Sequence, residues 1–183
     1  MASRSTNLQA GFGGYKGRAL RKGDFLPVGG QSSGARLCAE MPREFVPELS
    51  DEMVLRCLPG PQVEFFRNRG EELFTSEYRV TTQADRRGIR LEGPQIPHSG
   101  DSPGRVLSEP SLPGNIQVPG DGQPIVLLRE QTVGGYAKVA TVVSSDLWRL
   151  GQAAPGDRIR FQAVDRETAV SLRKEMRERL TEL

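Results

Sequence analysis

Residues 120–143 read GDGQPIVLLREQTVGGYAKVATVV, and two apolar runs within this stretch decide the fold class. Residues 125–128 and 139–143 are almost continuously apolar, which is typical of strands that are buried on both faces. Polar residues fill the segment between the two runs. We therefore expect two adjoining central strands, with a polar segment at the point where they leave the sheet.

Shorter runs elsewhere alternate apolar and polar side chains, as half-buried strands do. The chain also contains 21 glycines and 13 prolines, so turns must separate many short elements. These features predict a mainly β fold with short helices. The alternating apolar positions are Ile89 and Leu91, then Ile159, Phe161 and Ala163, and more weakly Tyr78, Val80 and Thr82.

Two stretches predict helices. Residues 146–150 predict one or two helical turns, with Ser145 as the amino-terminal cap and Trp148 as the core anchor. Residues 165–183 carry apolar side chains at positions 169, 172, 176, 180 and 183, which is the spacing of an amphipathic helix. We expect this C-terminal helix to pack on the domain, and contact with a partner chain is the alternative.

Composition excludes several classes of function. The 25 basic and 23 acidic residues give a formal net charge of +2, so no nucleic acid is expected as a partner. Cys38, Cys57 and the single His98 form no metal-binding spacing and no disulfide framework. No apolar run is long enough to span a membrane, and the first residues lack a secretory signal. A cytoplasmic protein without a metal or a membrane partner is expected.

The polar segment after the first apolar run holds the first candidate site. Gly134 and Gly135 fit a tight hairpin turn between the two strands, and this is the simplest explanation of the pair. The alternative is a site that recognises an amide, because the neighbouring side chains donate and accept hydrogen bonds and one is a cation. Those side chains are Gln123, Gln131, Thr132, Tyr136 and Lys138.

A second candidate site is the charged segment 83–94. It fits a solvated turn with surface ion pairs, or a site where Asp85 orients Arg87 or Arg90 to bind a carboxylate or phosphate. His98 has no catalytic triad pattern around it, so it is not expected to be a base. Residues 11–14 lack the lysine and hydroxyl of a P-loop, so ATP binding by this chain alone is not expected.

Long segments of the chain resemble one family. The chain is similar to the biotin-dependent carboxyltransferase-type family, which includes the C-type subunit of bacterial 5-oxoprolinase and allophanate hydrolase subunit 2. The resemblance implies a cyclophilin-like β-barrel. The segments that carry it are residues 3–6, 11–24 (GFGGYKGRALRKGD), 58–62 (LPGPQ), 85–94 (DRRGIRLEGP), 115–147 (NIQVPGDGQPIVLLREQTVGGYAKVATVVSSDL) and 155–157.

The chain departs from the family pattern in two ways. The family's usual first half does not precede Met1, so we expect residues 1–50 to be a remnant of the preceding subdomain with a linker, and residues 51–183 to be the carboxyltransferase-type domain. The isolated chain is then expected to be inactive. Arg87 also stands where the family more often has Met, and Glu130 where it often has Asp.

By resemblance, the chain is part of an ATP-dependent enzyme that opens the lactam of 5-oxoproline. The alternatives are the carboxyltransferase part of a biotin-dependent urea carboxylase or allophanate hydrolase system, and a non-catalytic interaction module. Companion subunits, including one of the B type, would use the ATP, and any biotin would arrive on a partner domain. The expected catalytic residues are Gln131, Tyr136 and Lys138, and the expected substrate-binding residues are Gln123, Thr132, Gly134, Gly135, Asp85 and Arg90.

Overall fold

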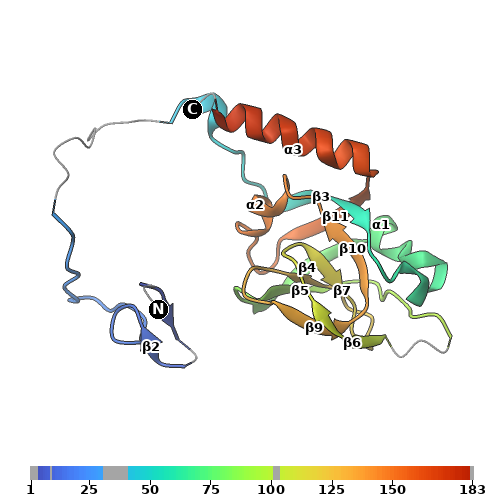
Figure 1. Ribbon diagram of the computed structural model, residues 1–183, viewed down its shortest axis with the longest axis horizontal. Helices are drawn as coiled ribbons and strands as arrows, with labels where there is room; N and C mark the ends of the chain where they lie inside the picture. Colours follow the sequence, from blue (N-terminus) through green and yellow to red (C-terminus); the bar gives the residue numbers. More distant parts are fainter. Residues whose placement is uncertain (1–3, 9, 31–40, 101–103, 182–183) are drawn as a thin grey trace. The chain divides into compact units, whose positions relative to one another are not determined.

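The computed structural model describes residues 4–8, 10–30, 41–100 and 104–181. The chain divides into two compact units, residues 1–46 and residues 47–183, which are described separately below (Figure 1). Residues 31–40, which include Cys38, lie outside the described residues.

The first unit consists of short elements held by polar contacts. Strands β1 (Thr6–Asn7) and β2 (Phe12–Gly13) pair antiparallel, and the 3₁₀ helix η1 (Arg43–Phe45) follows later in the chain. Arg18 donates to both carboxylate oxygens of Asp24, at 2.8 and 2.7 Å. This guanidinium lowers the pKa of the Asp24 carboxyl to about 2.

The second unit contains, within the described part of the chain, a closed barrel of seven strands. All of its neighbouring strands are antiparallel except β11 and β3, which run parallel. In order around the barrel, the strands are β10 (Lys138–Val142), β3 (Glu52–Pro59), β11 (Arg158–Ala163), β4 (Glu77–Ala84), β5 (Gly88–Glu92), β8 (Ile125–Leu127) and β7 (Asn115–Gln117).

Other elements lie around the barrel. Strands β6 (Arg105–Pro110) and β9 (Val133–Tyr136) pair antiparallel and form a separate two-stranded ribbon. Figure 1 shows this ribbon near β5 and β7 and the long α3 outside the barrel. Among its described residues, this unit has the helices η2 (Val63–Phe65), η3 (Arg67–Gly70), α1 (Glu72–Thr75), α2 (Leu147–Leu150) and α3 (Arg166–Thr181).

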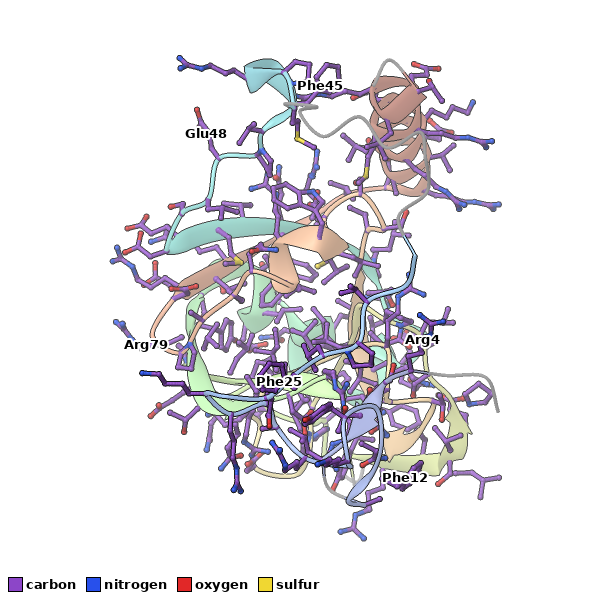
Figure 2. The ribbon with its side chains drawn as sticks, turned by 90° about the vertical axis from the view of Figure 1, so that its left-hand side faces the viewer. Arg4, Phe12, Phe25, Phe45, Glu48 and Arg79 are labelled. Atoms are coloured by element: carbon purple, nitrogen blue, oxygen red, sulfur yellow. The ribbon has the colours of Figure 1, made fainter. Side chains whose placement is uncertain are left out.

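Alternation along the strands builds the core inside the barrel. On β4, Tyr78 and Val80 point inward and are buried, whereas Arg79 between them lies on the outer surface (Figure 2). Burial raises the pKa of the Tyr78 phenol to about 12. Other buried core residues include Leu55, Cys57, Phe66, Leu73, Ile89, Leu91, Ile116, Val126, Val139, Ala140, Ile159 and Phe161.

The structure confirms the predicted mainly β barrel with short helices and a C-terminal helix. The predicted hairpin turn is wrong, because Gly134 and Gly135 lie inside β9 and neither has a left-handed φ. The two apolar runs do form barrel strands, β8 and β10, but they do not adjoin. Strand β7 lies between them and pairs with both.

The predicted helix at residues 146–150 is present as α2, but its contacts differ from those expected. Asp146 precedes α2, and its buried carboxylate accepts hydrogen bonds from the backbone amide and guanidinium of Arg56 on β3. The Ser145 hydroxyl caps nothing and has no hydrogen-bond partner. Leu150 is the buried anchor, whereas Trp148 is only partly buried and stacks with Arg149.

The C-terminal helix α3 begins at a capping residue, since Asp165 Oδ1 accepts a hydrogen bond from Thr168 N at 2.8 Å. This bond lowers the pKa of the Asp165 carboxyl. Of the expected apolar stripe, Ala169, Leu172 and Met176 are partly buried, and Leu180 is exposed. Position 183 lies outside the described residues.

Leu91→Ala is expected to destabilise the second unit by about 2–5 kcal/mol, because a buried leucine leaves a cavity. The matched control is Leu107→Ala on the β6–β9 ribbon, where the side chain is 93% exposed, against 1% for Leu91. Its effect should lie within about 0.5 kcal/mol. Urea denaturation measures both, and equal losses in the two variants would contradict the barrel core described above.

Candidate functional site

The second unit has a cleft on the outer face of its barrel. Its volume is about 560 Å³, within the range of small-molecule sites. The lining residues come from β4, the β4–β5 turn, β5, β8, β7, β9 and the segment before β9. They are Thr82, Gln83, Ala84, Asp85, Arg87, Gly88, Arg90, Gln117, Ile125, Leu127, Gln131 and Tyr136.

Strand register places three of these side chains in one row. Arg90 on β5 and Gln117 on β7 are both paired with Ile125 on the intervening β8. Their neighbours Ile89, Ile116 and Val126 point into the core, so the row must face outward. The same alternation that fills the barrel therefore lines the cleft.

Gln117 is a functional candidate that the sequence did not single out. It is only 3% exposed, and its Nε2 donates to the Tyr136 carbonyl at 3.3 Å. A Cβ at Gly134 would overlap the Gln117 amide, so glycine there allows the close approach of β9. The one feature of the sequence that could have identified Gln117 is its position as a single polar residue between the apolar Ile116 and Val118.

Two of the expected catalytic residues line the cleft next to Gln117. Tyr136 ends β9 and is 36% exposed. Gln131 precedes β9, and its Nε2 donates to the Val133 carbonyl, which fixes the direction of the amide. The structure therefore brings together amide side chains and a phenol from three separate segments, and it adds Gln83 on β4.

The charged side chains of the cleft form two ion pairs. Asp85 binds Arg87, with its Oδ2 2.8 Å from Nε and 2.7 Å from Nη2, and Arg90 Nη2 binds Asp121. The Arg87 guanidinium lowers the pKa of the Asp85 carboxyl. Of the two arginines that the sequence offered as partners of Asp85, the structure selects Arg87, and Arg90 is held by Asp121 instead.

Lys138, the third expected catalytic residue, does not line this cleft. It is 3% exposed, and its Nζ lies 2.6 Å from Glu109 Oε1 and 3.3 Å from the Pro110 carbonyl, both on β6. Gln62 completes the cluster, because its Nε2 donates to Glu109 Oε1 at 2.8 Å and its Oε1 accepts from Lys138 N at 3.0 Å. This Lys138–Glu109–Gln62 cluster ties the ribbon to the barrel.

The remaining expected substrate-binding residues lie outside the cleft lining. Both amide atoms of Gln123 bind the Gly93 backbone at 3.0 Å, so this side chain joins two loops. Thr132 is exposed, and its carbonyl accepts a hydrogen bond from Ser111 N at 2.9 Å. Gly135 lies on β9 next to Ser108 of β6.

Two further findings concern the described residues as a whole. In that part of the chain, no three His, Cys, Asp or Glu side chains are grouped so that they could hold a metal ion. Among the helices it contains, none has the length and apolar character needed to cross a membrane.

The second unit is thus a closed β-barrel domain with an amide-lined cleft on its outer face. The chain belongs to the family described as "Carboxyltransferase domain, subdomain A and B", whose model matches residues 1–163. This confirms the resemblance found in the sequence.

Individual relatives agree with this assignment. The chain is 36% identical over 177 residues to the C-type subunit of 5-oxoprolinase from Escherichia coli, covering 96% of this chain and 55% of that protein. It is 30% identical to urea amidolyase of Saccharomyces cerevisiae, covering 95% of this chain and 10% of that protein. The crystal structure of the K. lactis urea amidolyase matches with a TM-score of 0.79 and 28% identity, over 97% of this chain and 12% of that one. The chain thus spans about half the length of the 5-oxoprolinase subunits it matches.

Glu109→Gln is expected to weaken the dependence of the free energy of unfolding on pH in the acid range. The Lys138 ammonium, with the Gln62 amide, lowers the pKa of the Glu109 carboxyl below its usual 4.5. The stabilisation from this carboxylate is therefore present above pH 4.5 and is lost as the pH falls through the lowered pKa. At pH 7 the variant should be less stable by about 1–2 kcal/mol, below the cost for a fully buried pair, because Glu109 is 38% exposed.

Glu64→Gln is the matched control, since Glu64 pairs with Arg69 at the surface and both side chains are 66% exposed. It should change stability at pH 7 very little. Urea denaturation between pH 3 and pH 7 compares the two variants. If Glu109→Gln followed the profile of Glu64→Gln, the Lys138–Glu109–Gln62 cluster would not stabilise the fold.

Proposed function

We propose that the chain is the C-terminal part of a subunit in an ATP-dependent amidohydrolase of the 5-oxoprolinase type. The observation that carries this function is the convergence of Gln117, Gln131 and Tyr136 on one cleft. Amide groups both donate and accept hydrogen bonds, as the edge of a lactam does, and a phenol does the same. The 36% identity to the C-type 5-oxoprolinase subunit of Escherichia coli gives independent support.

The chemistry of lactam opening places negative charge on the carbonyl oxygen of the substrate. Fixed hydrogen-bond donors aimed at that oxygen stabilise the charge without reorganising during the reaction. Gln131 and Tyr136 are the donors we assign to it, and Gln117 binds the lactam edge beside them. Lys138 acts through Glu109 by holding the ribbon that carries Tyr136, rather than by touching the substrate.

ATP does not fit this cleft. A triphosphate carries several negative charges, whereas the pairing of Arg87 with Asp85 and of Arg90 with Asp121 leaves the cleft with little net positive charge to attract it. We propose that companion subunits, including one of the B type and the polypeptide that supplies the rest of the family's domain, bind and use the ATP. We also propose that the assembly is cytoplasmic.

A urea carboxylase activity is the second candidate, because urea amidolyase matches 95% of this chain. The cleft residues also fit a ureido group, whose N–H and C=O groups Gln117 and Gln131 can bind. Biotin on a partner domain would supply the carboxyl group in that case. A non-catalytic interaction module is the third possibility.

Thermal shift separates the three functions. 5-Oxoproline should raise the melting temperature of the chain, since a ligand that binds only the folded state stabilises it. If urea or biotin raised the melting temperature and 5-oxoproline did not, the urea carboxylase function would be supported in place of the 5-oxoprolinase function. The absence of any shift with 5-oxoproline, urea, biotin or ATP would leave only the interaction module.

Gln131→Ala and Tyr136→Phe are expected to lower 5-oxoproline-dependent ATP hydrolysis by about 100-fold each, as loss of one oxyanion donor does. The assay combines this chain with its companion subunits and the remainder of the family's domain. Thr132→Ala is the control, because Thr132 is exposed and does not line the cleft. Unchanged hydrolysis in both cleft variants would remove the two residues from the site.

Gly134→Ala is expected to abolish the thermal shift caused by 5-oxoproline, because the new methyl group must displace the Gln117 amide. Gly135→Ala is the matched control on the same strand. Its methyl group meets only Ser108 Oγ and the Val106 carbonyl at an ordinary 3.4 Å, so the shift should persist. A retained shift in Gly134→Ala would show that the Gln117 amide does not bind the ligand.

A further inference from the structure

We infer that Arg90, held in place by Asp121, binds a carboxylate group of the substrate and thereby selects an anionic lactam over a neutral amide. This role rests on the proposed function, since it requires the cleft to bind a lactam next to Arg90. It goes further by assigning separate residues to the two ends of the substrate.

The row across β5, β8 and β7 supplies the geometry. Arg90 and Gln117 are each paired with Ile125, so two strand spacings, or about 10 Å, separate their backbones. Both side chains line the same cleft, and so does the intervening Ile125. A small ring that lies on Ile125 can therefore present its amide edge to Gln117 and a carboxylate to Arg90.

Arg87, the other arginine of the cleft, binds Asp85 within the turn between β4 and β5. Asp85 binds the Arg87 guanidinium through Oδ2, and its Oδ1 accepts hydrogen bonds from Arg87 N at 2.8 Å and Gly88 N at 3.3 Å. The Asp85–Arg87 pair thus closes the turn between β4 and β5. The Arg87 side chain is also 59% exposed, so water competes for its remaining N–H groups.

Arg90 differs from Arg87 in its contacts and its burial. Its side chain is 28% exposed, and Asp121 binds it through Nη2. A guanidinium has five N–H donors, so Asp121 can orient the group while a second carboxylate binds the rest of the fork. Asp121 is itself fixed, because its Oδ1 accepts a hydrogen bond from Gln123 N at 3.1 Å.

The charge balance of the cleft explains why the contact between Arg90 and a carboxylate distinguishes an anionic lactam from a neutral amide. The two ion pairs leave the cleft close to neutral, so there is no general attraction for anions. A carboxylate is bound only where it can form directed, charge-assisted hydrogen bonds, and Arg90 provides them. Urea and unsubstituted lactams have no group for this contact.

Calorimetric titration of the full chain with 5-oxoproline and with 2-pyrrolidinone, the same ring without the carboxylate, tests the inference. The unmodified chain should bind 5-oxoproline about 10- to 100-fold more tightly. Arg90→Gln should remove this preference and leave 2-pyrrolidinone binding unchanged. Arg90→Lys, which keeps the charge but not the fork, should retain only part of the preference.

Arg87→Gln is the matched control and should keep the full preference. The inference is overturned if Arg90→Gln keeps the preference or if Arg87→Gln loses it. Unchanged binding of 2-pyrrolidinone shows that a variant is folded. If Arg90→Gln loses this binding, the test uses Arg90→Lys instead. If the unmodified chain binds 2-pyrrolidinone and 5-oxoproline with equal affinity, Arg90 does not bind the carboxylate, although the cleft still binds a lactam. If the unmodified chain binds neither lactam, the proposed function fails as well.

Discussion

The pairing of the short strand β7 with two partners is the constraint on which the second unit depends. Its residues Asn115, Ile116 and Gln117 are all buried, and it hydrogen-bonds to β8 on one side and β10 on the other. Without β7 the barrel would have two open edges. Because side chains alternate along a strand, the same three residues place Ile116 in the core and Gln117 in the cleft.

The cleft follows from this closure. Gln117 can reach the Tyr136 carbonyl only because β9 presents a glycine to it, and β9 is kept near the barrel through its partner β6. The Lys138–Glu109–Gln62 cluster joins β6 to β10 and to the segment before η2. The buried Lys138 ammonium and the Gln62 amide thus hold the ribbon on the barrel. The outward row from Arg90 to Gln117 lines the cleft in which we propose that the ligand binds.

Much of the fold could be predicted from the sequence, because local patterns determine it. Alternation identified β5 and β11, and continuous apolar runs identified β8 and β10. The cleft residues Gln131, Tyr136, Asp85 and Arg90 were also expected, since polar groups cluster at segments next to strands. Their grouping in one cleft agrees with that expectation, although their role in binding remains a prediction.

The remaining features depend on contacts between distant residues, which no local pattern reveals. Lys138 carried the signature of a catalytic cation, but its partner Glu109 lies 29 positions earlier. Gly134 and Gly135 read as a turn because that is their usual place, whereas packing against Gln117 explains Gly134 in a strand. The partner of Arg90 lies 31 positions away, so the nearer Asp85 was the natural choice.

The most direct test of the account is an NMR titration of the side-chain amides with 5-oxoproline. Binding in the cleft should shift the amide signals of Gln117 and Gln131 and leave that of Gln152, which does not line the cleft, unchanged. Shifts confined to Gln152 or to other surface amides, with Gln117 and Gln131 unmoved, would contradict a lactam site on the outer face of the barrel.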